Sequence, residues 1–161
     1  MPRHEKGFSL IELLIVVAII LVIVAIAIPN LIRSRIAANQ ASAIESLRVL
    51  GTAEVTYSAV YGNGYSTNLP ALGPVPPGAV ASASAAGLID DLLAGGAKSG
   101  YLFSYTPDLL DPTGRYNGFV ILANPTDAGV TGVDFYYTDE THLIRMNATA
   151  QAGSTDSCVA D

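Results

Sequence analysis

The chain has few of the side chains that catalysis, metal binding and covalent cross-linking require. Its 161 residues include one cysteine, two histidines and no tryptophan. One cysteine excludes a disulfide within the chain, and His4 and His142 supply too few nitrogen ligands for an ordinary zinc site. No serine, histidine and aspartate grouping is evident, and no HExxH spacing exists. The sequence therefore predicts neither an enzyme nor a transition-metal protein.

Positive charge is also scarce. The chain has 8 basic and 14 acidic residues, a formal net charge of −6. Beyond Gly62 the only basic residues are Lys98, Arg115 and Arg145, against ten acidic ones. Nucleic-acid binding depends on clusters of basic side chains that neutralise phosphates. We therefore predict no nucleic-acid partner.

What the chain does have is a long apolar run near its amino terminus. From Phe8 to Ile28 the only polar side chains are Ser9 and Glu12. As a helix rising about 1.5 Å per residue, this run covers roughly the 30 Å hydrocarbon core of a bilayer. A carboxylate at the centre of such a span costs roughly 2.5 to 3.5 kcal/mol, and less toward the interface. Glu12 therefore indicates a partner or a function.

The residues around this acid resemble a known export signal. The sequence reads KGFSLIE over residues 6–12, continues as the apolar run, and ends in Ile28-Pro29-Asn30. This pattern resembles the class III signal of type IV prepilins and of the related type II secretion pseudopilins. The resemblance implies that residues 1–7 are a leader, that a prepilin peptidase cuts after Gly7, and that the new terminal residue, Phe8, is N-methylated.

The position of Glu12 has a physical interpretation under this resemblance. After cleavage, the Phe8 amine would add positive charge to a helix terminus that is already positive. Glu12 lies one turn away, where it can compensate the amine of its own chain or that of an incoming subunit. Losing one partner of such a buried pair is costly, so the pair suits a role in setting register during assembly. An ordinary secretory signal cut after Ala27 and a plain membrane anchor are the alternatives.

One helix from about Phe8 to Tyr61 is predicted, with two different halves. Residues 8–29 form the transmembrane or filament-core half, and Pro29 predicts a kink there, with a simple helix end as the alternative. Beyond it, polar residues interleave with apolar ones at helical spacing. The apolar positions are Ile36, Ile44, Leu47, Leu50, Tyr57 and Tyr61, and the polar ones include Arg33, Arg35, Glu45, Arg48 and Glu54. Gly62-Asn63-Gly64 predicts the helix end.

The rest of residues 30–161 predicts a globular head. Residues 73–86 indicate an exposed loop, and Ala86 to Leu93 a short amphipathic helix. Alternating residues then predict about four antiparallel strands. Their faces carry Tyr101, Phe103 and Tyr105; Phe119, Ile121 and Ala123; Val133, Phe135 and Tyr137; and finally residues 143–147. We expect an α+β chain with the pilin fold, in which a spine helix packs on a small sheet.

Two features of the head leave alternatives open. Cys158 lies near a chain end, where segments commonly fray, so we expect a free thiol, with an intermolecular disulfide as the alternative. Oxygen ligands for calcium are present in Asp108, Asp111, Asp127, Asp134 and Asp139. Asp111-Pro112-Thr113-Gly114 partly resembles the calcium loop of major pseudopilins. The preferred interpretation is a solvated turn, and no cofactor is predicted.

The resemblance implies a structural subunit, the major pilin of a type IV pilus. Its implied partners are copies of itself, the prepilin peptidase and the inner-membrane pilus assembly machinery. Its implied location is the bacterial inner membrane and then an extracellular pilus. A pseudopilin of a periplasmic pseudopilus is the alternative within the family, and an anchored binding domain that does not polymerise is the alternative outside it. Adhesion, twitching motility, DNA uptake and electron transfer all remain open as uses.

Overall fold

The structure is a computed structural model that describes residues 8–159. Contacts divide the chain into two compact units, one up to Arg35 and one from Ile36 onward. A single helix, α1, runs from Leu10 to Tyr61 and contributes to both units. Ser9 precedes it, and its carbonyl accepts hydrogen bonds from the amides of Glu12 and Leu13 at 3.1 and 3.2 Å. The long helix predicted from Phe8 to Tyr61 is thus confirmed to within two residues at its start.

The end of α1 also follows the prediction. Gly62 has a φ of +65° and donates its amide to the Ser58 carbonyl at 3.0 Å. This left-handed conformation suits glycine because other residues pay a steric cost there. The predicted stop at Gly62 is therefore confirmed.

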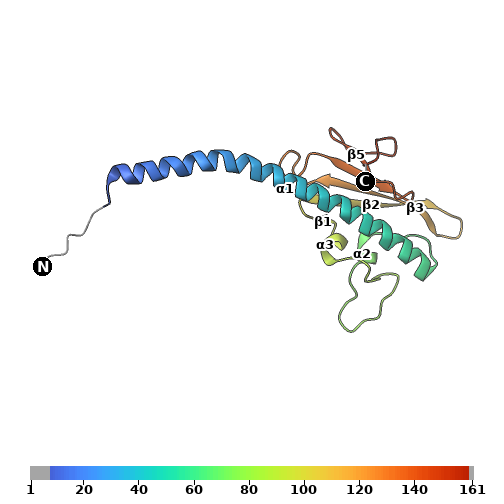
Figure 1. The fold of residues 1–161 in the computed structure, drawn as a ribbon. Helices are drawn as coiled ribbons and strands as arrows, with labels where there is room; N and C mark the ends of the chain where they lie inside the picture. The colour runs from blue at the N-terminus through green and yellow to red at the C-terminus, as the bar shows by residue number, and fades with distance from the viewer. Residues whose placement is uncertain (1–7, 160–161) are drawn as a thin grey trace. The chain divides into compact units, whose positions relative to one another are not determined.

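The second unit packs the carboxy-terminal half of α1 against an antiparallel sheet (Figure 1). The buried helix residues recur every three or four positions, as expected of an amphipathic helix. They are Ala43, Ser46, Leu47, Leu50, Gly51, Ala53, Glu54 and Tyr57. Placing Glu54 on the polar face was wrong, since its side chain lies on the buried stripe and is 0 % exposed.

The sheet has five strands in the order β1-β2-β3-β4-β5, and all neighbours are antiparallel. The strands are β1 (Ala97–Lys98), β2 (Tyr101–Leu110), β3 (Tyr116–Pro125), β4 (Phe135–Asp139) and β5 (Arg145–Asn147). The α+β class is confirmed, and the expected count of about four misses β1. Two residues are too few to show an alternating pattern, so no sequence signal marks this strand.

The buried face of the sheet is built from cross-strand rows. Phe103, Ala123 and Tyr136 are neighbours across β2, β3 and β4, and Tyr105, Ile121 and Thr138 form the next row. The faces predicted for β2 and β3 are confirmed by this arrangement.

The face predicted for β4 is wrong by one residue. Tyr136 is 2 % exposed, whereas Phe135 and Tyr137 are half-buried and Val133 lies outside the strand. The Tyr136 ring packs 5.9 Å from that of Tyr101, which fixes the register with Tyr136 inward. A shift of one residue moves every side chain of a strand to the opposite face.

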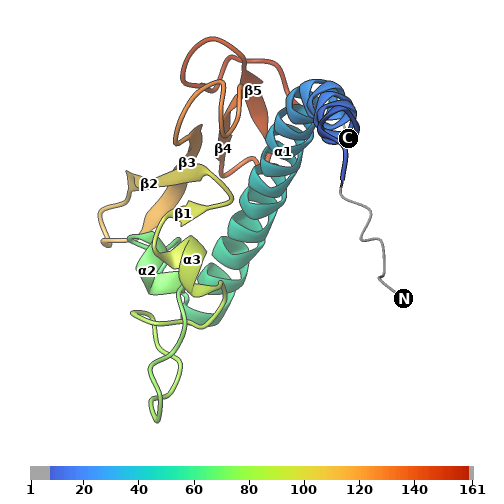
Figure 2. The ribbon, with the colours of Figure 1, turned by 90° about the vertical axis from the view of Figure 1, so that its left-hand side faces the viewer.

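Two short helices cover one end of the head (Figure 2). Helix α2 (Leu69–Leu72) was not predicted; the Asn68 side chain caps it by accepting the Ala71 amide at 3.0 Å. Helix α3 (Asp91–Ala94) is shorter than the predicted helix from Ala86 to Leu93. Residues 86–89 instead donate their amides to carbonyls of residues 71–73. The predicted loop from Gly73 is confirmed and projects from the head (Figures 1 and 2).

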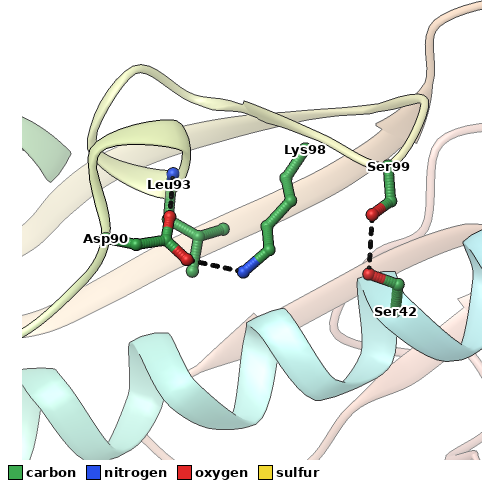
Figure 3. A network of polar contacts seen from close by, with 5 residues as sticks. All are labelled: Ser42, Asp90, Leu93, Lys98 and Ser99. Carbon is green, nitrogen blue, oxygen red and sulfur yellow. Dashed lines mark hydrogen bonds and ion pairs between the residues drawn. The ribbon is translucent and has the colours of Figure 1, made fainter.

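Polar contacts join α3, β1 and α1 in this region (Figure 3). The Asp90 carboxylate caps α3 by accepting the Leu93 amide at 2.8 Å and pairs with Lys98 Nζ at 2.6 Å. The Lys98 ammonium, followed by the Leu93 amide, lowers the pKa of Asp90. Ser42 Oγ on α1 donates to Ser99 Oγ at 2.8 Å. These contacts hold the turn after β1 against α1.

The carboxy-terminal segment is tied to β5. The Met146 amide donates to the Ser157 carbonyl at 2.9 Å, and the Val159 amide donates to the Ile144 carbonyl at 2.8 Å. Asp156 accepts from Asn147 and from the Gly153 amide. The expectation of a frayed end is therefore wrong as far as residue 159, because backbone pairing anchors it.

Candidate assembly surface

The apolar half of α1 exposes its side chains on all sides. Every large hydrophobic side chain from Leu10 to Ile28 is at least 40 % exposed, with Val24 at 40 % and Leu10 at 81 %. By length and composition, α1 is able to cross a membrane, and none of its most apolar part is buried within the chain. An apolar surface of this extent marks a site of contact with a membrane or with other proteins.

The amino-terminal end of this surface combines an exposed aromatic residue with an acid. Phe8 is 70 % exposed and precedes α1, and Glu12 lies in the first turn. A carboxylate in the first turn is favourable because the helix terminus carries partial positive charge. Within residues 8–159, Glu12 makes no ion pair. Gly7, the other predicted cleavage residue, lies outside the described residues.

Pro29 lies inside α1, which continues for 32 residues to Tyr61. The alternative that Pro29 marks the helix end is therefore excluded. Proline lacks the N–H that would bond the carbonyl four residues earlier, and its ring crowds that carbonyl. The kink expected there remains a prediction.

The head contains one functional group that the sequence analysis did not identify. Glu54 is fully buried and accepts hydrogen bonds from the Ser66 amide at 2.8 Å and the Ser66 hydroxyl at 2.6 Å. Tyr105 donates its hydroxyl to the Ser66 carbonyl at 2.8 Å. Burial raises the pKa of Glu54 against the opposing effect of the Ser66 hydrogen bonds. Burial, and then the Glu54 charge, also raise the pKa of Tyr105.

This cluster fastens the segment after α1 to the helix itself. Glu54 lies within α1, and Ser66 lies beyond Tyr61, the last residue of that helix. The two residues are twelve positions apart in the sequence. The spacing of Leu47, Leu50, Glu54 and Tyr57 is the signal that identifies Glu54 as inward-facing. Its chemistry here is structural, since the buried carboxylate accepts from two donors of Ser66, of which the amide has no other acceptor within the described residues.

The remaining candidate residues do not gather into a reactive site. Among residues 8–159, no group of three or more His, Cys, Asp or Glu side chains is placed to hold a metal ion. Asp111 instead accepts hydrogen bonds from Thr113 and from the Arg115 amide within its own turn. Cys158 is exposed, and its sulfur lies 3.7 Å from a guanidinium nitrogen of Arg145.

Comparison with known proteins finds similarity to pilins. The family described as the prokaryotic N-terminal methylation motif matches residues 2–28. The type IV major pilin protein PilA of Myxococcus xanthus is 48 % identical over 56 residues, which cover 35 % of this chain and 25 % of the relative. The type IV wide pilus major component PilA4 of Thermus thermophilus is 41 % identical over 70 residues, which cover 44 % and 53 %.

The chain thus spans between a quarter and about half the length of the curated relatives it matches. No solved structure matches it. The motif covers the exposed apolar helix and the residues on either side of Phe8. The methylation motif and the two partial matches are therefore what the chain shares with type IV pilus subunits.

Proposed function

We propose that the chain is the major structural subunit of a type IV pilus. The observation that carries the proposal is the apolar half of α1, which carries the methylation motif and has no buried residue in its most apolar part. The two relatives are named as a major pilin and a major pilus component. These names favour a pilus over a secretion pseudopilus and over an anchored domain that does not polymerise.

The proposed pathway starts at the inner membrane. A prepilin peptidase cuts after Gly7, Phe8 is N-methylated, and residues 8–29 hold the subunit in the bilayer until the assembly machinery transfers it to the filament. Residues 30–161 remain outside the membrane throughout. In the extracellular pilus, residues 8–29 of many copies form the core.

Contact among many copies is required for this transfer. Leaving lipid brings little hydrophobic gain, because lipid tails are as apolar as the side chains of residues 8–29. Close packing between neighbouring helices must therefore supply the stabilisation. The side chains of this segment are not buried within the chain, so the core of the head does not depend on them. This supports the proposal that the segment serves contact with other copies.

Glu12 positions the incoming subunit in this scheme. Its carboxylate lies four residues from Phe8 and has no ion-pair partner in the described residues. The amine of a neighbouring mature chain supplies one. A pair buried in an apolar core tolerates little displacement, because an unpaired charge there is strongly unfavourable.

The central experiment replaces Glu12 in cells that produce filaments. Glu12→Val should leave the processed subunit in the membrane while filament yield falls sharply. Glu12→Gln removes only the charge, and it should lower filament yield in the same way because the charge is what pairs with the amine of the neighbouring chain. Glu45→Gln is the matched control, since Glu45 is an exposed acid of the same helix outside the apolar segment. Normal filaments from Glu12→Val would contradict the proposal that Glu12 positions the incoming subunit.

Processing is tested separately by intact mass. The mature subunit should begin with N-methylated Phe8 and retain the apolar segment, and Gly7→Glu should leave the precursor uncut. A mature chain starting at Ile28 would instead identify an ordinary secretory signal. Electron micrographs of purified surface fibres, with subunit mass determined from the same sample, distinguish a pilus from a periplasmic pseudopilus.

A further inference from the structure

A cavity of about 390 Å³ is lined by residues from the end of α1, the segment that follows it, and the β2–β3 turn. Its walls carry Tyr57, Tyr65 and Tyr116 together with Asn63, Thr67 and Arg115. The volume lies in the range of about 300 to 1,000 Å³ that is usual for small-molecule sites. All its residues belong to the second unit.

Backbone contacts fix the segment after α1 to the start of β3, and these two segments line the cavity. The Tyr65 amide donates to the Tyr116 carbonyl at 2.8 Å, and Gly64 pairs with Tyr116 in a parallel bridge. Gly64 has a φ of +79°, and a Cβ there would lie 2.3 Å from the Tyr116 carbonyl oxygen. Glycine at this position allows the two segments to approach. The cavity is therefore largely formed before any ligand binds.

The turn that carries Arg115 is held by its own acid. The Asp111 carboxylate accepts from the Thr113 hydroxyl at 2.6 Å and from the Thr113 and Arg115 amides at 2.8 and 3.0 Å. These bonds, with the Thr113 hydroxyl first, lower the pKa of Asp111 to about 2. The Asp111 carboxylate bonds these groups of its own turn and does not pair with the Arg115 guanidinium. The Arg115 side chain is therefore available to a ligand.

Arg115 differs from the other basic residues of the head. Lys98 pairs with Asp90, and Arg145 donates to the Asp156 carbonyl. Of the lysine and arginine side chains in residues 63–159, that of Arg115 alone makes no hydrogen bond or ion pair. None of the cavity's lining residues is acidic. The Arg115 guanidinium is therefore a site for a single negative charge in a head whose charged residues are mostly acidic.

The other lining groups suit a polyhydroxylated ring. The hydroxyls of Tyr65 and Tyr116 and the amide of Asn63 have no hydrogen-bond partner in the described part of the chain. Tyr57 is 5 % exposed and uses its hydroxyl to bond the Ala83 carbonyl at 2.8 Å, so it contributes little free surface to the cavity. Tyrosine combines an apolar ring face with a polar tip. Such faces pack against the C–H face of a pyranose while neighbouring polar groups bond its hydroxyls.

We propose that this cavity binds an acidic sugar residue, with the carboxylate on Arg115 and the ring against the tyrosines. A planar guanidinium binds a carboxylate through two parallel hydrogen bonds. One guanidinium is too little charge for a nucleic acid or a polyphosphate, which need several basic groups. The ligand class is therefore a uronic acid unit of a polysaccharide. This site does not depend on polymerisation.

The test uses the mature full-length chain in a detergent without a sugar head group, titrated in a calorimeter with trigalacturonate. Saturable binding to one site per chain is expected. The methyl ester of the same trisaccharide keeps the rings and loses the charge, so it should bind about tenfold more weakly or worse. Arg115→Gln should reduce trigalacturonate binding to the level of the ester, and Tyr116→Ala should weaken both ligands.

Lys98→Gln is the matched control because it removes a positive charge elsewhere on the head. It should leave trigalacturonate binding unchanged, and circular dichroism should show that all three variants remain folded. No saturation, equal binding of acid and ester, or equal losses in Arg115→Gln and Lys98→Gln would each overturn the proposal. Inorganic phosphate that displaces the sugar at equal affinity, with Tyr116→Ala harmless, would show a simple anion site instead.

Discussion

Replacing Glu54 with alanine should destabilise the head by about 2 to 3 kcal/mol. The buried Ser66 amide loses its acceptor, and an unsatisfied buried donor costs about 1 to 3 kcal/mol. The Ser66 hydroxyl keeps a second acceptor, the Asn68 carbonyl at 3.2 Å. The vacated space adds a cavity cost. Removing a carboxylate whose pKa burial has raised offsets part of the total.

The measurement is urea unfolding of residues 30–161, followed by far-ultraviolet circular dichroism. We expect this fragment to fold because every buried residue lies at Ala43 or beyond. With a typical denaturant slope, the midpoint should fall by about 1 to 2 M urea. Glu54→Gln keeps an acceptor for the amide and should lose less than about 1 kcal/mol. Glu45→Ala, at an exposed site, should stay within about 0.5 kcal/mol.

A Glu54→Ala variant as stable as Glu45→Ala would refute this reasoning. Such a result would mean that water or a rearranged backbone satisfies the Ser66 amide. The hydrogen bonds from Ser66 would then describe geometry without contributing to the free energy of unfolding.

Three further predictions concern the same fragment. Because the pKa of Glu54 is raised, its contribution to stability is present below the unfolded value of about 4.5 and is lost as pH rises through the folded pKa; Glu54→Gln should therefore gain stability relative to wild type between pH 4 and pH 8, and constant spacing of the two unfolding curves would contradict the shift. Gly64→Ala should cost about 2 kcal/mol or more, since a Cβ would lie 2.3 Å from the Tyr116 carbonyl oxygen, whereas Gly153→Ala, with open space around it, should be nearly neutral in the same urea titration. Leu47→Ala should cost about 2 to 5 kcal/mol by thermal or urea unfolding because Leu47 is 1 % exposed, and a loss below about 1 kcal/mol would mean that the core closes around the gap.

The helix and most of the sheet were predictable because their signals are local and repeated. The apolar run from Phe8 to Ile28 and the spacing of Leu47, Leu50 and Tyr57 each extend over several turns. The same spacing included Glu54, yet its charge favoured an exposed position in the prediction. Burial became acceptable only through Ser66, a partner that sequence reasoning had no means of placing.

The parts that were missed depend on pairing between distant segments. Which residue of β4 faces inward is decided by the contact of Tyr136 with Tyr101, and both alternations fit the sequence. Helix α2 has four residues, fewer than a periodic pattern needs. The cavity around Arg115 requires the end of α1 and the β2–β3 turn to meet, and neither segment carries a binding motif.

The outer edges of the sheet bear on how the chain avoids aggregation. Exposed strands offer unpaired backbone groups to other chains, and densely packed copies of one protein increase that risk. Here β1 has two residues and β5 has three, so each edge offers little template. The part of β2 beyond β1 contains Pro107, which has no N–H, and Leu109, whose φ of +53° interrupts the extended backbone. Copies are therefore steered away from joining sheet to sheet.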